Sequence, residues 1–354
     1  MTQLSVSNNI TKTVLKINDN NRLFWNTQRA LSFDLFLYII MGGRGIGKTT
    51  GFLIDVIREH INTGNEFIYM RRYKNEIKGF KKKNPIKKII DGCEYVADGL
   101  GGYTIMYKKK VMGYLVALSV AQEYKSADFS KVDKIGYDEA ILKPKSPQKY
   151  LAGEVEDLLE FISTVYRLRT KGKVFIFGNN LNLFNPYTAY FNIPTFQGDY
   201  YIDKNRGVYF EVCKSNPNLR VEEEKTPFFK LVNGTAYGDY HYENEVLTDV
   251  TKNTMEKPLD CKILCRFKMY NDTINVYYFT KDKDTWLYAE RKDKDINDDI
   301  TYTIFNKQGN PNYYDMSQVR IRFKSFLEMY YYKGNIGYND DKCAGVVSAI
   351  MDLI

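Results

Sequence analysis

Eight residues near the start of the chain constrain its fold more than any other segment. They read Gly42-Gly43-Arg44-Gly45-Ile46-Gly47-Lys48-Thr49 and fit the pattern G-x-x-x-x-G-K-[ST]. A continuous apolar run, Leu35–Met41, precedes them, and a plausible helix, Thr49–His60, follows. Small residues let several backbone N–H groups converge on one anion, and the helix adds its positive N-terminus. The pattern therefore predicts a buried parallel strand, a phosphate-binding loop and a helix, and with them a nucleotide site.

The residue types of this loop suit a nucleoside triphosphate bound with magnesium. Lys48 would reach the β- and γ-phosphates, and the hydroxyl of Thr49 would coordinate Mg²⁺. A glycine turn with an exposed lysine is the alternative, but such a turn would not need the flanking strand and helix. We expect the nucleotide to be bound by Gly42, Gly43, Arg44, Gly45, Ile46, Gly47, Lys48, Thr49 and Thr50.

An acidic pair follows a second expected core strand, Val132–Tyr137. At the end of such a strand, Asp138 would hold magnesium through water, and Glu139 would polarise the attacking water. An Asp-Glu pair separates ATPases with an additional catalytic carboxylate from kinases and most GTPases. The strand is less aliphatic than usual, because Asp133, Lys134 and Gly136 interrupt it. An exposed surface pair is the alternative reading, and the position after the phosphate-binding loop favours the site.

Polar residues at the ends of two later elements are further candidates. Asn179 and Asn180 follow an expected strand, Val174–Gly178, where a polar side chain would lie beside the γ-phosphate and could sense hydrolysis. An Asn-rich turn explains them equally well. Arg167 and Arg169 follow an expected helix, Glu154–Val165. They are either a solvated helix end or groups that stabilise transition-state charge in a neighbouring subunit.

Strands that alternate with helices indicate βαβ units and a parallel, right-handed α/β sheet. After about residue 205 the pattern changes to short aromatic strands and then to two helical stretches, Gln318–Tyr332 and Asp341–Ile354. A chain of 354 residues is long enough for two domains. We expect an N-terminal extension (1–29), a P-loop domain (30–205), a linker (206–255) and a smaller α+β C-terminal domain (256–354).

The chain carries 51 basic and 43 acidic residues, a net charge of +8 that is compatible with a polyanionic partner. The run Leu35–Met41 is far too short to cross a bilayer, and the polar N-terminus lacks the apolar core of a signal peptide. We therefore expect an intracellular protein without a membrane span. Lysine clusters could contact nucleic-acid phosphates without sequence choice, or could simply be solvated. They include Lys74, Lys81, Lys82, Lys83, Lys87, Lys88 and Lys108–Lys110.

Several separated blocks resemble the DNA-packaging motor ATPases of small short-tailed phages, the Picovirinae-type podoviruses. Together they cover most of residues 30–245, with a weaker similarity to the end. The blocks are Met41–Lys48, Glu66–Lys74, Leu118–Val120 with Lys125-Ser126, Asp138-Glu139, Thr164–Arg169, Asn179, Asn185-Pro186-Tyr187 and Asn233–Gly238. Their order along the chain is far more specific than the phosphate-binding loop alone.

This resemblance implies an ASCE-type P-loop domain, a short linker and a C-terminal domain similar to a degenerate, vestigial RNase H-like nuclease. It implies a homopentameric ring at the portal (connector) vertex of the empty capsid, in some cases docked on a structural prohead RNA. The ring drives double-stranded DNA inward at the expense of ATP. It works in the host cytoplasm, transiently on the procapsid, and is absent from the mature virion.

The resemblance also assigns roles by position. Arg167 resembles a trans-acting arginine finger, and Lys125 resembles a second basic residue at the subunit interface. Arg44 matches an arginine of the loop that gates the catalytic glutamate.

Three other functions stay open on the residues alone. A large-terminase-like enzyme with an active nuclease would need clustered carboxylates, for which Asp272, Asp282 and Asp284 are available. A ring helicase or another translocase would share the ATPase core. A non-catalytic assembly protein would bind nucleotide without turnover.

Overall fold

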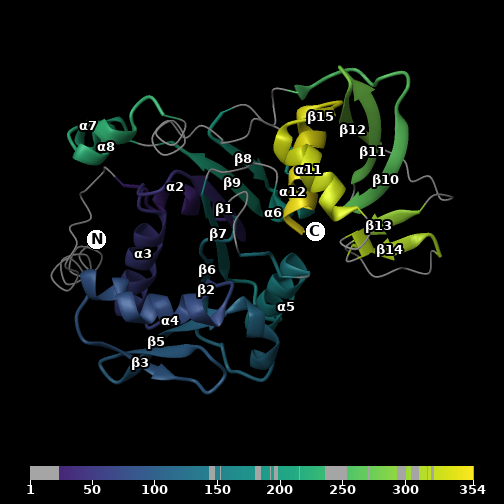
Figure 1. Cartoon of the computed structure of the whole chain (residues 1–354). Coiled ribbons are helices and arrows are strands. Elements are labelled where there is room, and N and C mark those ends of the chain that lie inside the picture. Colours follow the sequence, from purple (N-terminus) through teal and green to yellow (C-terminus); the bar gives the residue numbers. More distant parts are fainter. Residues whose placement is uncertain are drawn as a thin grey trace. The chain divides into compact units, whose positions relative to one another are not determined.

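The computed structural model describes residues 24–142, 148–151, 153–179, 185–191, 193–194, 198–214, 216–235, 253–269, 272–292, 300–303, 311–316, 318–319 and 323–353. Contacts divide the chain into two compact units (Figure 1). The first comprises Met1–Ile141, Glu156–Asn180 and Phe196–Glu245. The second comprises Leu142–Val155, Leu181–Thr195 and Val246–Ile354. Within the described residues, no helix has the length and apolar character needed to span a membrane.

The first unit is built on a nine-stranded sheet with the order β3-β4-β5-β2-β6-β7-β1-β9-β8. Its strands are β1 (Leu37–Gly42), β2 (Glu66–Arg71), β3 (Cys93–Ala97), β4 (Tyr103–Tyr107), β5 (Lys110–Ala117), β6 (Val132–Tyr137), β7 (Lys173–Asn179), β8 (Tyr200–Asp203) and β9 (Val208–Cys213). The six strands from β5 to β9 in this order are parallel, and β3, β4 and β8 add antiparallel edges. The predicted parallel α/β sheet is confirmed.

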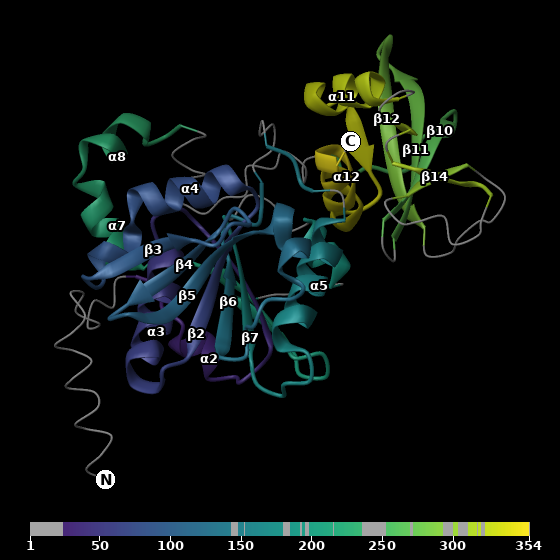
Figure 2. The ribbon, with the colours of Figure 1, turned by 90° about the horizontal axis from the view of Figure 1, so that it is seen from below.

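Helices cover both faces of this sheet. Helices α3 and α4 lie on one face, and α5 lies on the other (Figures 1 and 2). The described helices of the first unit are α2 (Gln28–Leu31), α3 (Lys48–Thr63), α4 (Lys74–Lys83), η1 (Pro85–Lys88), η2 (Leu118–Tyr124), α5 (Glu154–Tyr166), α7 (Pro217–Glu224) and α8 (Pro227–Val232). The first two residues of α5 are assigned to the second unit.

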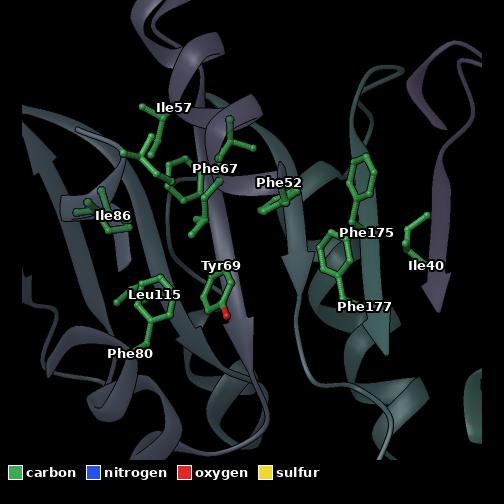
Figure 3. Packing of buried hydrophobic residues seen from close by; sticks show 14 of the residues in the cluster. Ile40, Phe52, Ile57, Phe67, Tyr69, Phe80, Ile86, Leu115, Phe175 and Phe177 are labelled. Atoms are coloured by element: carbon green, nitrogen blue, oxygen red, sulfur yellow. The ribbon is translucent and has the colours of Figure 1, made fainter. Parts of the chain in front are cut away.

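Aromatic side chains fill the core between α3, α4 and the sheet (Figure 3). The ring of Phe52 on α3 lies 5.5 Å from the rings of both Phe175 and Phe177 on β7. Tyr69 on β2 lies 4.3 Å from Phe80 on α4, between ring centroids. Burying such a side chain contributes about 1.5–3 kcal/mol, so these contacts hold the two helices on the sheet.

Helix α3 explains two of the three residues that interrupt the apolar pattern of β6, Lys134 and Gly136. A Cβ atom added at Gly136 would lie 2.4 Å from the ring of Phe52, so glycine is needed for the close approach of α3. The ammonium of Lys134 lies 3.1 Å from the Asp55 carboxylate and also pairs with Glu59. The strand therefore carries an ion cluster and a glycine where an aliphatic face would be usual, because α3 packs on both.

The structure places two domain boundaries differently from the prediction. The N–H of Trp25 donates to the carbonyl of Ile46 at 2.8 Å, so residues 24–29 pack on the P-loop domain, not as an extension. Strand β9 pairs with β1, so the sheet continues to Cys213, eight residues beyond the expected end at residue 205. Both boundaries depend on contacts between distant segments, which local pattern does not report. Residues 1–23 and 236–252 lie outside the described residues.

The second unit contains a six-stranded sheet with the order β14-β13-β10-β11-β12-β15. Its elements are α6 (Pro186–Tyr190), β10 (Lys262–Met269), β11 (Asp272–Lys281), β12 (Asp284–Lys292), β13 (Thr301–Thr303), β14 (Tyr313–Asp315), α11 (Lys324–Lys333), β15 (Ile336–Tyr338) and α12 (Asp341–Leu353). Residues of α11 and α12 form a core with the sheet. The predicted aromatic strands and two terminal helices are present; Gln318 and Val319 are helical as expected, and α11 itself begins at Lys324.

Candidate nucleotide site

The phosphate-binding loop connects the buried strand β1 to α3. The ammonium of Lys48 donates to the carbonyl oxygens of Gly42 at 2.7 Å and Gly43 at 2.8 Å. Lys48 is only 8% exposed, and this burial lowers its pKa to about 8. A desolvated cation at the start of a helix is a favourable place for phosphate oxygens, which would replace the loop carbonyls as its partners.

Residues just before α2 pack against this loop. Gly47 has a φ of 92°, in the left-handed region, and a Cβ atom there would lie 2.8 Å from the Cβ of Phe24. In α3, a Cβ atom at Gly51 would lie 2.5 Å from the carbonyl oxygen of Trp25. The loop and its helix therefore need glycine at both positions, because the segment around Trp25 packs directly against them.

The candidate magnesium ligands lie next to each other. The hydroxyl of Thr49 at the start of α3 donates to Oδ2 of Asp138, directly after β6, at 2.6 Å. A hydroxyl and a carboxylate are hard oxygen ligands, which fit Mg²⁺. Among the described residues no group of three or more His, Cys, Asp or Glu side chains could hold a metal. An ion at this place would therefore complete its coordination with water and with nucleotide oxygens, as Mg²⁺ usually does.

Two residues of β2, which the sequence analysis did not assign to the site, also contact Asp138. Tyr69 donates its hydroxyl to Oδ2 of Asp138 at 2.7 Å and accepts a bond from Nε of Arg71 at 2.9 Å. Nη2 of Arg71 lies 3.3 Å from the same carboxylate oxygen. Burial and the charge of Asp138 raise the pKa of Tyr69 well above its usual value, so the phenol remains a donor. The signal in the sequence is their i, i+2 spacing, which puts both side chains on one face of a strand.

Glu139 is paired with the same arginine. Nη1 of Arg71 lies 2.5 Å from Oε2 of Glu139, whose side chain is 53% exposed, and the N–H of Glu139 donates to Oδ1 of Asp138 at 2.9 Å. The resemblance assigned the gating of this glutamate to Arg44. In the structure Arg71 contacts the carboxylate, and the side chain of Arg44 is exposed. Arg71 thus links both carboxylates of the acidic pair.

Asn179 lies at the same edge of the sheet. Strand β7 is the parallel neighbour of β1, and Asn179 pairs in register with Gly42 at the first residue of the phosphate-binding loop. The carboxyl ends of β1, β6 and β7 therefore bring together the loop, the acidic pair and the expected sensor. Asn180 lies outside the described residues.

Comparisons with known proteins identify the family of the chain. A family model described as podovirus DNA encapsidation protein (Gp16) matches residues 19–351, nearly the whole chain. The chain belongs to this family. It is 31% identical over 260 residues to the DNA packaging protein of Bacillus phage phi29, covering 72% of this chain and 75% of that protein.

Two solved structures share the fold of this Gp16-family chain. One is described as the Phi-28 gp11 DNA packaging motor, with a TM-score of 0.66, 17% identity and coverage of 93% of this chain and 97% of that one. The other is described as the bacteriophage Phi-29 viral genome packaging motor assembly, with a TM-score of 0.60, 23% identity and coverage of 94% and 100%. Both similarities extend over the two units of the chain.

The Gp16-family chain holds Arg167 and Lys125 at the opposite edge of the sheet from the loop. Helix α5 ends beside the beginnings of β6 and β7, where Nη2 of Arg167 donates to the carbonyl of Lys125 at 3.3 Å. Strand β6 separates this edge from Asp138 by roughly 20 Å. Neither residue can therefore reach the nucleotide site of its own subunit.

Arg169 has a different environment from Arg167. Its guanidinium donates to four backbone carbonyls, those of Phe129, Ser130, Val132 and Val165. Arg167 is exposed and has a φ of 43°, a left-handed conformation that usually favours glycine after a helix. Of the two arginines, Arg169 braces the fold and Arg167 faces solvent.

Six of the predicted nucleic-acid lysines lie on α4 and η1, whereas Lys108–Lys110 lie where the chain turns from β4 into β5. Lys81 lies 4.3 Å above the ring of Tyr103, and the side chain of Lys74 lies beside Gly101. The remaining four are exposed and belong to the same unit as the nucleotide site: Lys82, Lys83, Lys87 and Lys88.

The carboxylates required by an active nuclease do not cluster. Asp272 begins β11, whereas Asp282 and Asp284 lie at the turn beyond its other end, about 30 Å away. Asp272 is buried and lies 3.5 Å from Arg291 and 3.3 Å from Lys342. The alternative of a two-metal nuclease built from these three aspartates is therefore wrong.

Proposed function

We propose that this Gp16-family chain hydrolyses ATP to ADP and phosphate and uses the reaction to move double-stranded viral DNA into an empty capsid. The observation that carries the proposal is the Thr49–Asp138 hydrogen bond, which joins the phosphate-binding helix to the acidic strand, with Glu139 beside it. The phi29 relative is named a DNA packaging protein, which supports DNA as the polymer that is moved.

Each residue of the site then has a role in hydrolysis. Lys48 binds the β- and γ-phosphates, and Thr49 and Asp138 hold magnesium, Asp138 through water. When bound, Mg²⁺ neutralises charge that develops on the transferred phosphoryl group. Glu139 accepts a proton from the attacking water once its carboxylate leaves Arg71, which holds it in the structure. Asn179 senses the γ-phosphate from the end of β7.

The positions of Arg167 and Lys125 support a ring in which each site is completed by a neighbour. They lie too far from their own Asp138 to act in the same subunit, and Arg167 keeps an exposed, left-handed conformation. We infer a homo-oligomeric ring, a pentamer at the portal vertex, working in the host cytoplasm and absent from the mature virion. A structural prohead RNA is a further partner that we infer from the family.

In this proposal the protein grips DNA through the phosphate backbone while the DNA is moved. The lysines of α4 and η1 supply charge without base-reading geometry, so packaging would be independent of sequence. We propose that residues 256–354 form a vestigial RNase H-like domain without cleavage activity. The salt bridges of Asp272 support this, because arginine and lysine occupy the surroundings where a nuclease would bind metal.

The test is the ATPase rate of the purified protein, measured alone, with double-stranded DNA, and with DNA and empty capsids. The proposal expects the highest rate with both, and no rate above background for Lys48→Ala. Turnover that neither DNA nor capsids change would contradict the coupling of hydrolysis to packaging. No turnover at all would favour a non-catalytic assembly protein. Strand separation without capsids would favour a helicase.

A further inference from the structure

A second arginine, Arg72, directly follows β2 and contacts the main chain next to the acidic pair. Arg72 is 1% exposed, and its Nη2 donates to the carbonyl of Ala140 at 2.7 Å. Its Nη1 lies 3.5 Å from the carbonyl oxygen of Glu139. The guanidinium carbon lies 6.0 Å from the ring centroid of Tyr137. Arg71 binds the side chains of the acidic pair, whereas Arg72 reaches the main chain that follows them.

This main chain has an uncommon conformation. Glu139 has a φ of 55°, in the left-handed region that residues other than glycine, asparagine and aspartate rarely adopt. Such a conformation persists only where the surroundings fix it, and it is frequent at active sites. Here the N–H of Glu139 donates to Asp138 at 2.9 Å, and the N–H of Ala140 donates to the carbonyl of Phe177 at 2.9 Å. These bonds fix the N–H groups of the turn, and Arg72 fixes its carbonyls.

We propose that Arg72 is a positioning residue for Glu139. Its buried guanidinium holds the carbonyls of Glu139 and Ala140, keeps the turn left-handed, and so aims the Glu139 carboxylate at the place of hydrolysis. The inference rests on the proposed role of Glu139 as the base. Arginine suits the task because its planar fork offers several donors in fixed directions and stays charged when buried, whereas a lysine ammonium is a single point.

The experiment compares Arg72→Gln, Arg72→Lys and Glu139→Gln in the full chain. Binding of Mg·ATP is measured with a fluorescent analogue, and kcat and KM are measured separately. We expect Arg72→Gln to lower kcat about 100-fold while the Kd for Mg·ATP stays within about threefold, since small misplacements of a catalytic group cost this much. The kcat of Arg72→Lys should be about tenfold higher than that of Arg72→Gln. Arg72→Gln added to Glu139→Gln should cause almost no further loss, because both act through one group.

Arg266→Gln is the matched control. Arg266 is a buried arginine of the second unit, 3% exposed, whose Nε donates to Asn275 at 2.7 Å. Its replacement removes a comparable buried charge without touching the turn after β6, so kcat should stay within about twofold of the unmodified chain. A loss of kcat in this control as large as in Arg72→Gln would assign the effect to general destabilisation and overturn the inference.

The outcomes separate this inference from the proposed function. If Glu139→Gln abolishes turnover but Arg72→Gln leaves kcat unchanged, the inference fails and the base assignment stands. If Glu139→Gln keeps full turnover, both fail. If Arg72→Gln does not fold, Arg72→Lys decides, because an unchanged kcat with lysine would contradict the need for a fork of donors.

Discussion

Replacing Lys134 tests how α3 is fixed to the strand that carries Asp138. The Lys134 side chain is 8% exposed, lies 3.1 Å from Asp55 and pairs with Glu59. Lys134→Met keeps a similar volume but removes the cation. The two carboxylates, 19% and 23% exposed, then face each other without a partner charge.

The expected loss follows from this burial. Removing one partner of a buried ion pair costs about 3–5 kcal/mol. Because Asp55 and Glu59 retain some contact with water, we expect the lower end, a loss of about 3 kcal/mol at neutral pH. For a chain of 354 residues, whose unfolding entropy is about 2.1 cal/mol/K per residue, the thermal midpoint should fall by about 4 °C.

The loss should depend on pH with a defined sign. Burial opposes ionisation of Glu59, but the ammonium of Lys134 outweighs it and lowers the pKa of Glu59. In the unmodified chain this carboxylate therefore stabilises the fold above its ordinary pKa, and the contribution is lost as the pH falls through the lowered value. In Lys134→Met no cation balances the carboxylates of Asp55 and Glu59, so protonating one of them removes their mutual repulsion. The difference between the two proteins should shrink as the pH falls from about 7.5 to about 4, below the ordinary pKa of glutamate.

Urea unfolding at these two pH values measures the difference in the free energy of unfolding. Lys131→Met, an exposed lysine before the same strand, is the control and should change stability by less than about 0.5 kcal/mol. A loss below about 1 kcal/mol for Lys134→Met, or a loss that is equal at both pH values, would refute the argument that the buried cation fixes α3.

Three further predictions concern the site. Glu139→Gln should bind Mg·ATP with unchanged affinity and lose turnover by at least about 100-fold in single-turnover assays, and retained turnover would remove Glu139 as the base. Arg167→Ala should be inactive alone but regain hydrolysis when mixed with Lys48→Ala subunits, as each then supplies what the other lacks, and mixed rings without activity would argue against action in trans. Since burial lowers the pKa of Lys48 to about 8, phosphate binding should draw a proton onto it above that pH. Calorimetry in buffers of different ionisation enthalpy should therefore show proton uptake on ATP binding near pH 9 and almost none near pH 7, and equal uptake at both would contradict the burial argument.

Sequence pattern alone predicted the elements whose cause is local. The glycine loop, its strand and its helix are contiguous in the sequence, so the spacing of their residues was enough to predict how they are arranged. The apolar runs around Val132–Tyr137 and Val174–Gly178 predicted parallel strands for the same reason, and the structure confirms both. The irregular pattern of β6, by contrast, made sense only when Phe52, Asp55 and Glu59 of α3 were seen against it.

Only the tertiary structure decided which distant residues meet. Strand β2 is the neighbour of β6, and this pairing brings Tyr69, Arg71 and Arg72 to an acidic pair more than sixty residues later in the chain. The pairing of β9 with β1 and the placement of Arg167 at the far edge of the sheet have the same origin. Periodicity reports backbone conformation and burial along one segment. Strand order and the reach of a side chain depend on packing across the whole sheet, which no local pattern contains.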